Sequence, residues 1–299
     1  RYIYRHYPLY YENDKAVLAA HAAESAGLQD KFWQMHDWLN SNFELWSELS
    51  QEAFYDWILE AATGLDLDVQ RFDDDFTNAE LALLMVEAYE EAALAGVPGV
   101  PFVFVNGDWF RTSPTLPNLE AAIRLILLQE QQFKTRPEMT IDEDALYLAR
   151  MVTSAGDIVI QLYPRSAPLS VNSFVFLALQ DWFDGTTFHL VAPGMVVHGG
   201  DPSETGLGTP GYFIPAEIDP SLSFDQPGMV AMVSSGPGTN GSQFLINLAT
   251  TSELSGANTI FGRVIEGIEI LQALERRDPL IDLLSEPEII IHDVEIEVQ

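Results

Sequence analysis

The sequence predicts two domains, a largely helical first half with one short buried strand and a mainly β second half. Apolar residues recur three and four positions apart through residues 16–133, whereas strands and turns dominate from Tyr147 onward. With 299 residues and 47% hydrophobic residues, the chain is long enough and apolar enough for two separate cores.

Helices are expected through most of the first half. Gly27 separates two of them, and Ser50 is the predicted N-cap of a third that stops at Gly64. Two further helices are predicted over residues 77–96 and 117–132.

Short strands complete the first half. The stretch "VPGVPFVFVNGDWF" predicts a buried strand followed by a turn at Asn106-Gly107. The opening "RYIYRHYPLY" is also expected to be a strand, one that is already under way at Arg1.

The second half is expected to be a closed barrel. A polar segment, residues 134–146 around Pro137, is the predicted linker to it. A hairpin should turn at Ser154–Gly156, and the final "EIIIHDVEIEV" alternates as an edge strand does. The helical stretches "APLSVNSFVFLALQ" and "GIEILQALERR" would cap the barrel at each end.

Composition excludes several functions. A net charge of −31 repels phosphate backbones, so nucleic acid is not an expected partner. No apolar run approaches the roughly 20 residues that cross a bilayer. The chain has no cysteine, which excludes disulfides and thiolate chemistry within it. The acidic run at residues 72–76 lacks the ligand spacing of a calcium loop, and no metal site or cofactor is predicted.

Four motifs of the second half carry a resemblance. In order and spacing, "GDIVIQLYPRSAPLSVNSFVFLA", "DGTTFHLVAPGMVVHGGDP", "GPGTNGSQFLI" and "TIFGRVIEG" resemble the cyclophilin-type peptidyl-prolyl isomerases. The resemblance implies an eight-stranded barrel with two capping helices over residues 147–299. It also implies rotation about X-Pro bonds as the reaction and proline-containing peptides as ligands.

The resemblance also implies a missing catalytic group. In cyclophilins an arginine follows the Phe-His pair and donates a hydrogen bond to the proline nitrogen, whereas here Leu190 follows His189. One preorganised donor of this kind contributes about 2.7–4 kcal/mol, so its loss should slow turnover about a hundred- to a thousandfold. The catalytic residue is therefore unknown, and His198 is a candidate substitute donor.

The peptide-binding positions follow motif by motif from the same resemblance. They include two survivors of the family pattern, Gln243 and Leu254. The other implied positions are Met195, Val196, His198, Val233, Ser234, Ser235, Leu245 and Asn258. His189 is expected to be a framework residue with its ring hydrogen-bonded inside the barrel. An arginine from elsewhere, such as Arg150 or Arg263, would restore the missing cation if it pointed into the groove beside Gln243.

A second resemblance covers the first half. "YRHYPL", "LAAHAAESAGLQDKFWQMHDWL" and "GVPGVP" resemble the DsbA-like branch of the thioredoxin fold, an α/β fold with a helical insertion. It implies that residues 1–133 form such a domain without its first strand and Cys-x-x-Cys helix, with the N-terminal segment missing. Pro101 would be the cis-proline of that fold.

Together the two resemblances predict an extracytoplasmic protein-folding factor with a weak peptidyl-prolyl isomerase domain. Its expected partners are proline-containing peptides or unfolded secreted proteins. Two alternatives stay open: a non-catalytic proline-peptide-binding or chaperone-like module, or a thiol-disulfide oxidoreductase if a Cys-x-x-Cys precedes Arg1.

Overall fold

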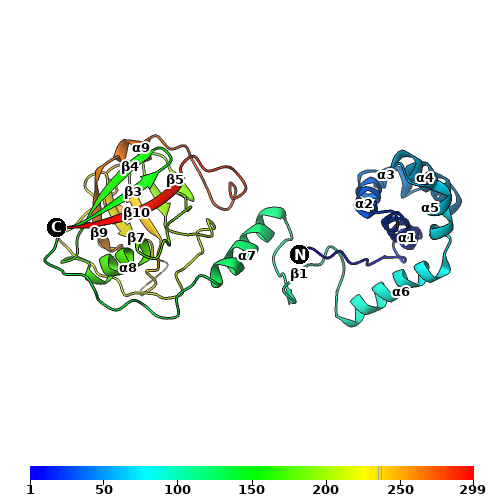
Figure 1. The fold of residues 1–299 in the computed structure, drawn as a ribbon, viewed down its shortest axis with the longest axis horizontal. Coiled ribbons are helices and arrows are strands. Elements are labelled where there is room, and N and C mark those ends of the chain that lie inside the picture. The colour runs from blue at the N-terminus through cyan, green and yellow to red at the C-terminus, as the bar shows by residue number, and fades with distance from the viewer. Residues whose placement is uncertain (235, 237) are drawn as a thin grey trace. The chain divides into compact units, whose positions relative to one another are not determined.

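A computed structural model describes residues 1–234, 236 and 238–299 and divides the chain into two units (Figure 1). The first unit is Arg1–Arg111 and the second is Thr112–Gln299. Separate clusters of buried apolar side chains lie in the two units. The predicted two separate cores are therefore observed, and each unit is described by itself below.

Six helices make up most of the first unit. They are α1 (Ala16–Gly27), α2 (Phe32–Ser41), α3 (Phe43–Trp46), α4 (Gln51–Gly64), α5 (Val69–Phe76) and α6 (Ala79–Leu94). The Ser50 hydroxyl accepts a hydrogen bond from the Ala53 N–H at 3.2 Å and so caps α4, as predicted. Met35, Phe54 and Phe72 are fully buried at the centre of these helices.

A two-residue hairpin turn follows the helices. Strands β1 (Phe104–Val105) and β2 (Asp108–Trp109) are joined by Asn106 and Gly107, whose φ angles are 51° and 90°. Positive φ at both positions is the geometry that favours Asn-Gly, which confirms the predicted turn. The Val100–Pro101 peptide bond is cis, as predicted.

The prediction of a strand over residues 1–10 is wrong. The segment pairs with no other strand among the described residues, and without such a ladder its backbone has no sheet to join. Its side chains pack instead against α2, where the Tyr4 ring lies 5.5 Å from Phe32 and 5.0 Å from His36, centroid to centroid.

An eight-stranded antiparallel sheet dominates the second unit. Its order is β10-β3-β4-β9-β7-β8-β6-β5. The strands are β3 (Tyr147–Thr153), β4 (Gly156–Leu162), β5 (Leu190–Ala192), β6 (Val196–Gly199), β7 (Met229–Met232), β8 (Phe244–Asn247), β9 (Ile260–Glu266) and β10 (Ile291–Val298). The sheet curls until residues beside its two edge strands meet, with Thr187 bridged to Ile290.

Two helices cover the curled sheet as predicted. Helix α8 (Pro168–Ala178) and helix α9 (Ile268–Gln272) lie on opposite sides of it (Figure 1). Phe174 of α8 and Leu271 of α9 are both buried in the barrel core. A short 3-10 turn, η1 (Ser252–Leu254), lies between β8 and β9.

Helix α7 (Leu116–Gln129) belongs to the second unit, although the predicted boundary placed it in the first. Leu128 is 3% exposed and lies in the barrel core. The predicted linker after it is also packed down, since the Asn172 side chain accepts from the Thr140 N–H at 2.8 Å and donates to the Glu138 carbonyl at 2.9 Å.

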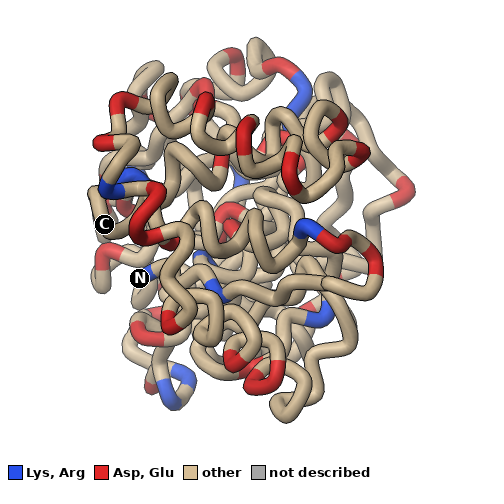
Figure 2. The backbone as a smooth tube through the Cα atoms, turned by 90° about the vertical axis from the view of Figure 1, so that its right-hand side faces the viewer, with Lys and Arg blue, Asp and Glu red and all other residues tan. Residues whose placement is uncertain are grey.

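Acidic residues lie along the whole backbone and far outnumber basic ones (Figure 2). Among the described residues, none of the helices is both long enough and apolar enough to span a bilayer.

Candidate functional site

The register of three short strands builds the candidate site. Leu190 on β5 lies opposite His198 on β6, which lies opposite Leu245 on β8, which lies opposite Ala231 on β7. Directly paired residues project on the same side of a sheet, so these four side chains form one row across the outer face.

The residues that alternate with this row point inward. Val191, Val197, Ile246 and Val230 are likewise paired in register, and all four belong to the barrel core. The inner row therefore anchors the strands, and in the outer row Leu190 and His198 are partly exposed whereas Leu245 and Ala231 are buried.

An apolar cluster surrounds the outer row. Leu245 and Val196 are 4% and 8% exposed, and they pack with the fully buried Phe224. The partly buried Leu190, Val233 and Leu254 pack against this cluster. The structure thus brings together four of the predicted binding residues, and it adds Leu190 to them.

Leu190 leaves this surface without a guanidinium at the family position. Arg150 is committed to the opposite edge of the sheet, where it donates to Asp157 at 3.0 Å. Arg263 lies opposite Met229 on β7, and β7, β8 and β6 separate its strand from β5. At about 4.8 Å between strands, roughly 19 Å of sheet divides β9 from β5. Neither arginine lies in the paired row of Leu190, His198, Leu245 and Ala231.

Two histidines lie beside Leu190. The His189 and His198 rings are 6.5 Å apart, centroid to centroid. Burial, reinforced by His189, lowers the pKa of His198 to about 4, and burial also lowers the pKa of His189. Both rings are therefore neutral at pH 7, so His198 could offer only a neutral imidazole N–H. His189 is buried as expected, and its ring hydrogen-bonds the Gln243 side chain, whereas its Nδ1 has no partner among the described residues.

Gln243 is held at the edge of the cluster by the backbone. Its side-chain amide donates to the Gly208 carbonyl at 2.9 Å, and the Gln243 side chain also hydrogen-bonds the His189 ring. Asn258 is bonded less tightly, through its side-chain amide to the Leu254 carbonyl at 3.3 Å.

The remaining predicted residues lie at the rim. Met195 is 45% exposed in the turn between β5 and β6 and lies outside the apolar cluster. The Ser234 hydroxyl bonds within its own loop, to the Gly236 carbonyl at 2.6 Å. Ser235 lies outside the described residues.

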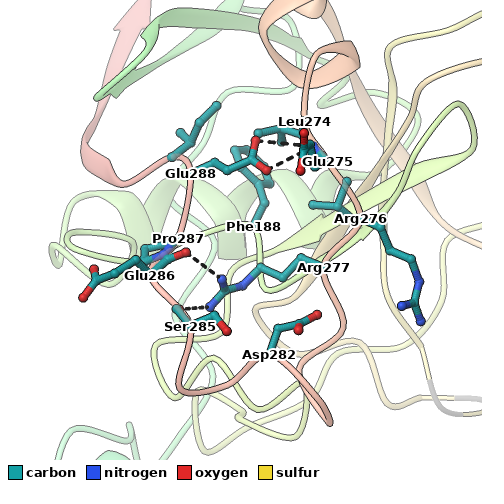
Figure 3. A pocket seen from close by; sticks show the side chains of 12 residues that line it. Phe188, Leu274, Glu275, Arg276, Arg277, Asp282, Ser285, Glu286, Pro287 and Glu288 are labelled. Carbon is teal, nitrogen blue, oxygen red and sulfur yellow. Dashed lines mark hydrogen bonds between the residues drawn. The ribbon is translucent and has the colours of Figure 1, made fainter.

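A cavity of about 150 Å³ lies on the far side of β5 (Figure 3). Residues 274–289 form most of its wall, together with Phe188 and Val191. Arg277 pairs its backbone with Val191 and donates its guanidinium to the Ser285 and Glu286 carbonyls at 3.1 and 3.3 Å. Because Val191 faces inward and Leu190 outward, this cavity is distinct from the outer row.

Comparison with known proteins identifies the family of the second unit. Residues 148–296 match the family described as cyclophilin type peptidyl-prolyl cis-trans isomerase/CLD. Peptidyl-prolyl cis-trans isomerase B of Streptomyces anulatus is 44% identical over 131 residues, which span 39% of this chain and 75% of that protein. The chain belongs to the cyclophilin family.

Other cyclophilins show similar agreement. The probable peptidyl-prolyl cis-trans isomerase A of Mycobacterium bovis is 41% identical over 43% of this chain and 80% of its own length. The human peptidyl-prolyl cis-trans isomerase-like 1 is 43% identical over 39% of this chain and 72% of its length. A cyclophilin crystal structure from Cryptosporidium parvum, 31% identical, aligns over 51% of this chain and 98% of that chain with a TM-score of 0.46.

The first unit matches a different family. Residues 1–124 match the model described as Thioredoxin, so this cyclophilin domain follows a thioredoxin-like domain in one chain. The match extends into α7, although α7 packs with the second unit.

Sequence reasoning missed several residues of the cyclophilin site. Phe224, Met229 and Ile260 form the buried base of the apolar cluster, and Gly208 supplies the carbonyl that holds Gln243. The run "PSETGLGTPG" after Asp201 was the available signal for the last, because closely spaced glycines mark places where other atoms approach the backbone.

Proposed function

We propose that the cyclophilin half of this chain binds proline-containing segments of incompletely folded polypeptides and isomerises them slowly. The observation that supports this is the position of Leu190, at the end of the outer row, where it packs with the apolar cluster of Leu245, Val196 and Phe224. Such a surface suits a proline ring, and the Gln243 side chain, which also bonds His189, supplies the polar group for the peptide backbone.

Slow turnover follows from what the reaction needs. An X-Pro bond rotates unaided in about tens to hundreds of seconds, because rotation breaks amide conjugation. In the twisted transition state the proline nitrogen becomes a hydrogen-bond acceptor, and a donor aimed at it lowers the barrier without tightening the ground state. Leu190 donates nothing, so the groove binds both isomers and the twisted form with little discrimination.

The test restores the donor. In the full-length protein, Leu190→Arg should raise kcat/KM for a proline tetrapeptide about a hundred- to a thousandfold, since one preorganised donor contributes about 2.7–4 kcal/mol. Exchange NMR between the cis and trans signals of the peptide measures this rate without a coupling protease.

A matched control separates the donor from side-chain length. Leu190→Met places a longer, unbranched apolar side chain in the same cluster. It supplies no hydrogen-bond donor, so the rate should stay near that of the wild type. If Leu190→Arg binds the peptide and still gives no acceleration, the groove has lost more than its donor, and a purely binding function is the better description.

We also propose that the whole chain acts on secreted proteins outside the cytoplasm, with a DsbA-like first domain. The pairing of a thioredoxin-like domain with a cyclophilin domain supports this, because disulfide exchange and proline isomerisation both act on incompletely folded secreted chains. Immunodetection of the native protein in cytoplasmic and extracytoplasmic fractions tests the location, and a purely cytoplasmic signal would contradict it.

A further inference from the structure

We propose that helix α7, which precedes the matched cyclophilin region, is a positioning element of the peptide groove that acts on Gln243 through Leu128. The inference rests on the proposed peptide binding, because Gln243 is the polar group of that groove. The family match begins at residue 148, whereas α7 ends at Gln129.

Leu128 is pressed against the turn that holds Gln243. A Cβ added to Gly208 would lie 2.8 Å from the Leu128 Cδ2 and 1.9 Å from the Asp201 Oδ1. Gly208 is therefore enclosed between an apolar side chain from α7 and a buried carboxylate. No larger residue fits there, so the position of this backbone depends on both neighbours.

The same glycine carries the contact to the groove. Its N–H donates to the Asp201 Oδ2 at 3.0 Å, and its carbonyl accepts from the Gln243 side-chain amide at 2.9 Å. A shift of Gly208 moves the acceptor that orients Gln243. Leu128 thus contacts Gly208, and Gly208 in turn bonds Gln243. Leu128 is therefore a positioning residue and not a peptide-binding one.

A second contact from α7 holds the start of the same turn. The Arg124 Nη1 donates to the Glu204 Oε2 at 2.6 Å, and the Glu204 Oε1 accepts from the Thr187 hydroxyl at 2.9 Å. Thr187 lies three residues before Leu190, the first residue of β5. Arg124 therefore connects α7, through Glu204, to Thr187 in the segment just before β5.

The residues after α7 hold the end of the turn. The Gln132 side chain donates to the Thr209 carbonyl at 3.0 Å, and the Phe133 N–H donates to the Pro210 carbonyl at 2.8 Å. The turn from Glu204 to Pro210 is thus bonded at both ends to residues 124–133. From these contacts, the functional cyclophilin unit of this chain includes α7.

The experiment compares two neighbouring leucines in the full-length protein. Leu128→Ala should shift the Gln243 side-chain amide signals in a ¹H–¹⁵N spectrum and raise the Kd for a proline tetrapeptide about three- to tenfold, since binding loses a preorganised group. Leu127→Ala, on the same helix but 55% exposed, should change neither.

The outcomes separate this inference from the proposed function. Unchanged Gln243 signals and unchanged Kd in Leu128→Ala would overturn the positioning role. If the wild type binds no proline peptide, the proposed function fails, while the Gln243 signals still report whether Leu128 positions that side chain.

Two further variants keep the test valid if Leu128→Ala unfolds. Leu128→Val removes less volume and should produce a smaller shift of the same Gln243 signals. Arg124→Gln should also shift them, and Arg124→Lys should partly restore them because the ammonium can still pair with Glu204. A loss of stability with Gln243 signals unmoved in all variants would show a purely structural helix.

Discussion

At the scale of one residue, the proposed slow turnover depends on Leu190. Its backbone is in register with His198 and Leu245, so the strand geometry that would aim a family arginine is intact. Only the side chain differs, and it joins the apolar cluster. In the proposed function, this substitution removes one hydrogen-bond donor and adds apolar area.

His198 makes a pH prediction at the same scale. Its pKa is about 4 in the folded protein, against 6.5 for the free side chain, mainly because of burial. Between these two values the unfolded state binds the proton and the folded state does not. The free energy of unfolding should therefore fall as the pH drops from about 6.5 to about 4.

The variant His198→Gln isolates this contribution. Glutamine does not titrate, so the variant should lose less stability on acidification, with a difference of about 1–3 kcal/mol at pH 4. Urea denaturation at a series of pH values measures both proteins. Parallel pH curves would show that His198 does not carry the predicted proton linkage.

At the scale of elements, helix α8 depends on a residue far along the chain. Ala167 stands at its N-cap without a side-chain acceptor, and Pro168 follows. Glu217 fills the role, with its carboxylate accepting from the Leu169 N–H and the Ser170 N–H, both at 2.9 Å. A negative charge at a helix N-terminus also stabilises the helix by its favourable interaction with the helix dipole.

Removing this charge should destabilise the barrel. We expect Glu217→Gln to lower the free energy of unfolding by about 1–3 kcal/mol, because charged hydrogen bonds to two backbone N–H groups are weakened. Glu143→Gln, an exposed carboxylate substitution in the same unit, is the control and should change stability little. Calorimetry of the second unit's transition reports both, and equal midpoints for the two variants would contradict the capping role.

At the scale of the whole molecule, each unit has its own buried apolar core. The helical core around Phe54 and Phe72 lies entirely within Arg1–Arg111, and the barrel core lies entirely within Thr112–Gln299. Since each unit buries its own apolar side chains, each carries its own source of stability.

Calorimetry should therefore resolve two unfolding transitions. Phe54→Ala removes a fully buried ring and should destabilise the first unit alone, by about 3–5 kcal/mol. Leu45→Ala, 65% exposed in the same unit, should leave both transitions in place. If Phe54→Ala lowers both transitions together, the units unfold as one.

Much of the fold was predictable because its signals are local. The Asn106-Gly107 turn, the Ser50 cap and the hairpin between β3 and β4 each depend on a few neighbouring residues. The strand predicted at the N-terminus was wrong, because a strand exists only with a partner that supplies its hydrogen bonds. The assignment of α7 to the second unit could not be predicted either, because an apolar stripe on a helix does not indicate which core the helix packs against.

The site was predictable in part for a related reason. Long motifs identified Val196, Leu245 and Leu254, and the structure brings them together with Leu190. They gave no sign of Phe224 or of the Gly208 carbonyl, which reach the site from irregular loops.

The sequence by itself determined the hairpin between β3 and β4, because a tight turn between two strands is a property of consecutive residues. It also determined that no arginine follows His189. Only the tertiary structure decided that Glu217 caps α8 and that Leu128 encloses Gly208. These contacts join residues 47 and 80 positions apart, and such pairs are selected by the packing of the whole barrel rather than by any local preference.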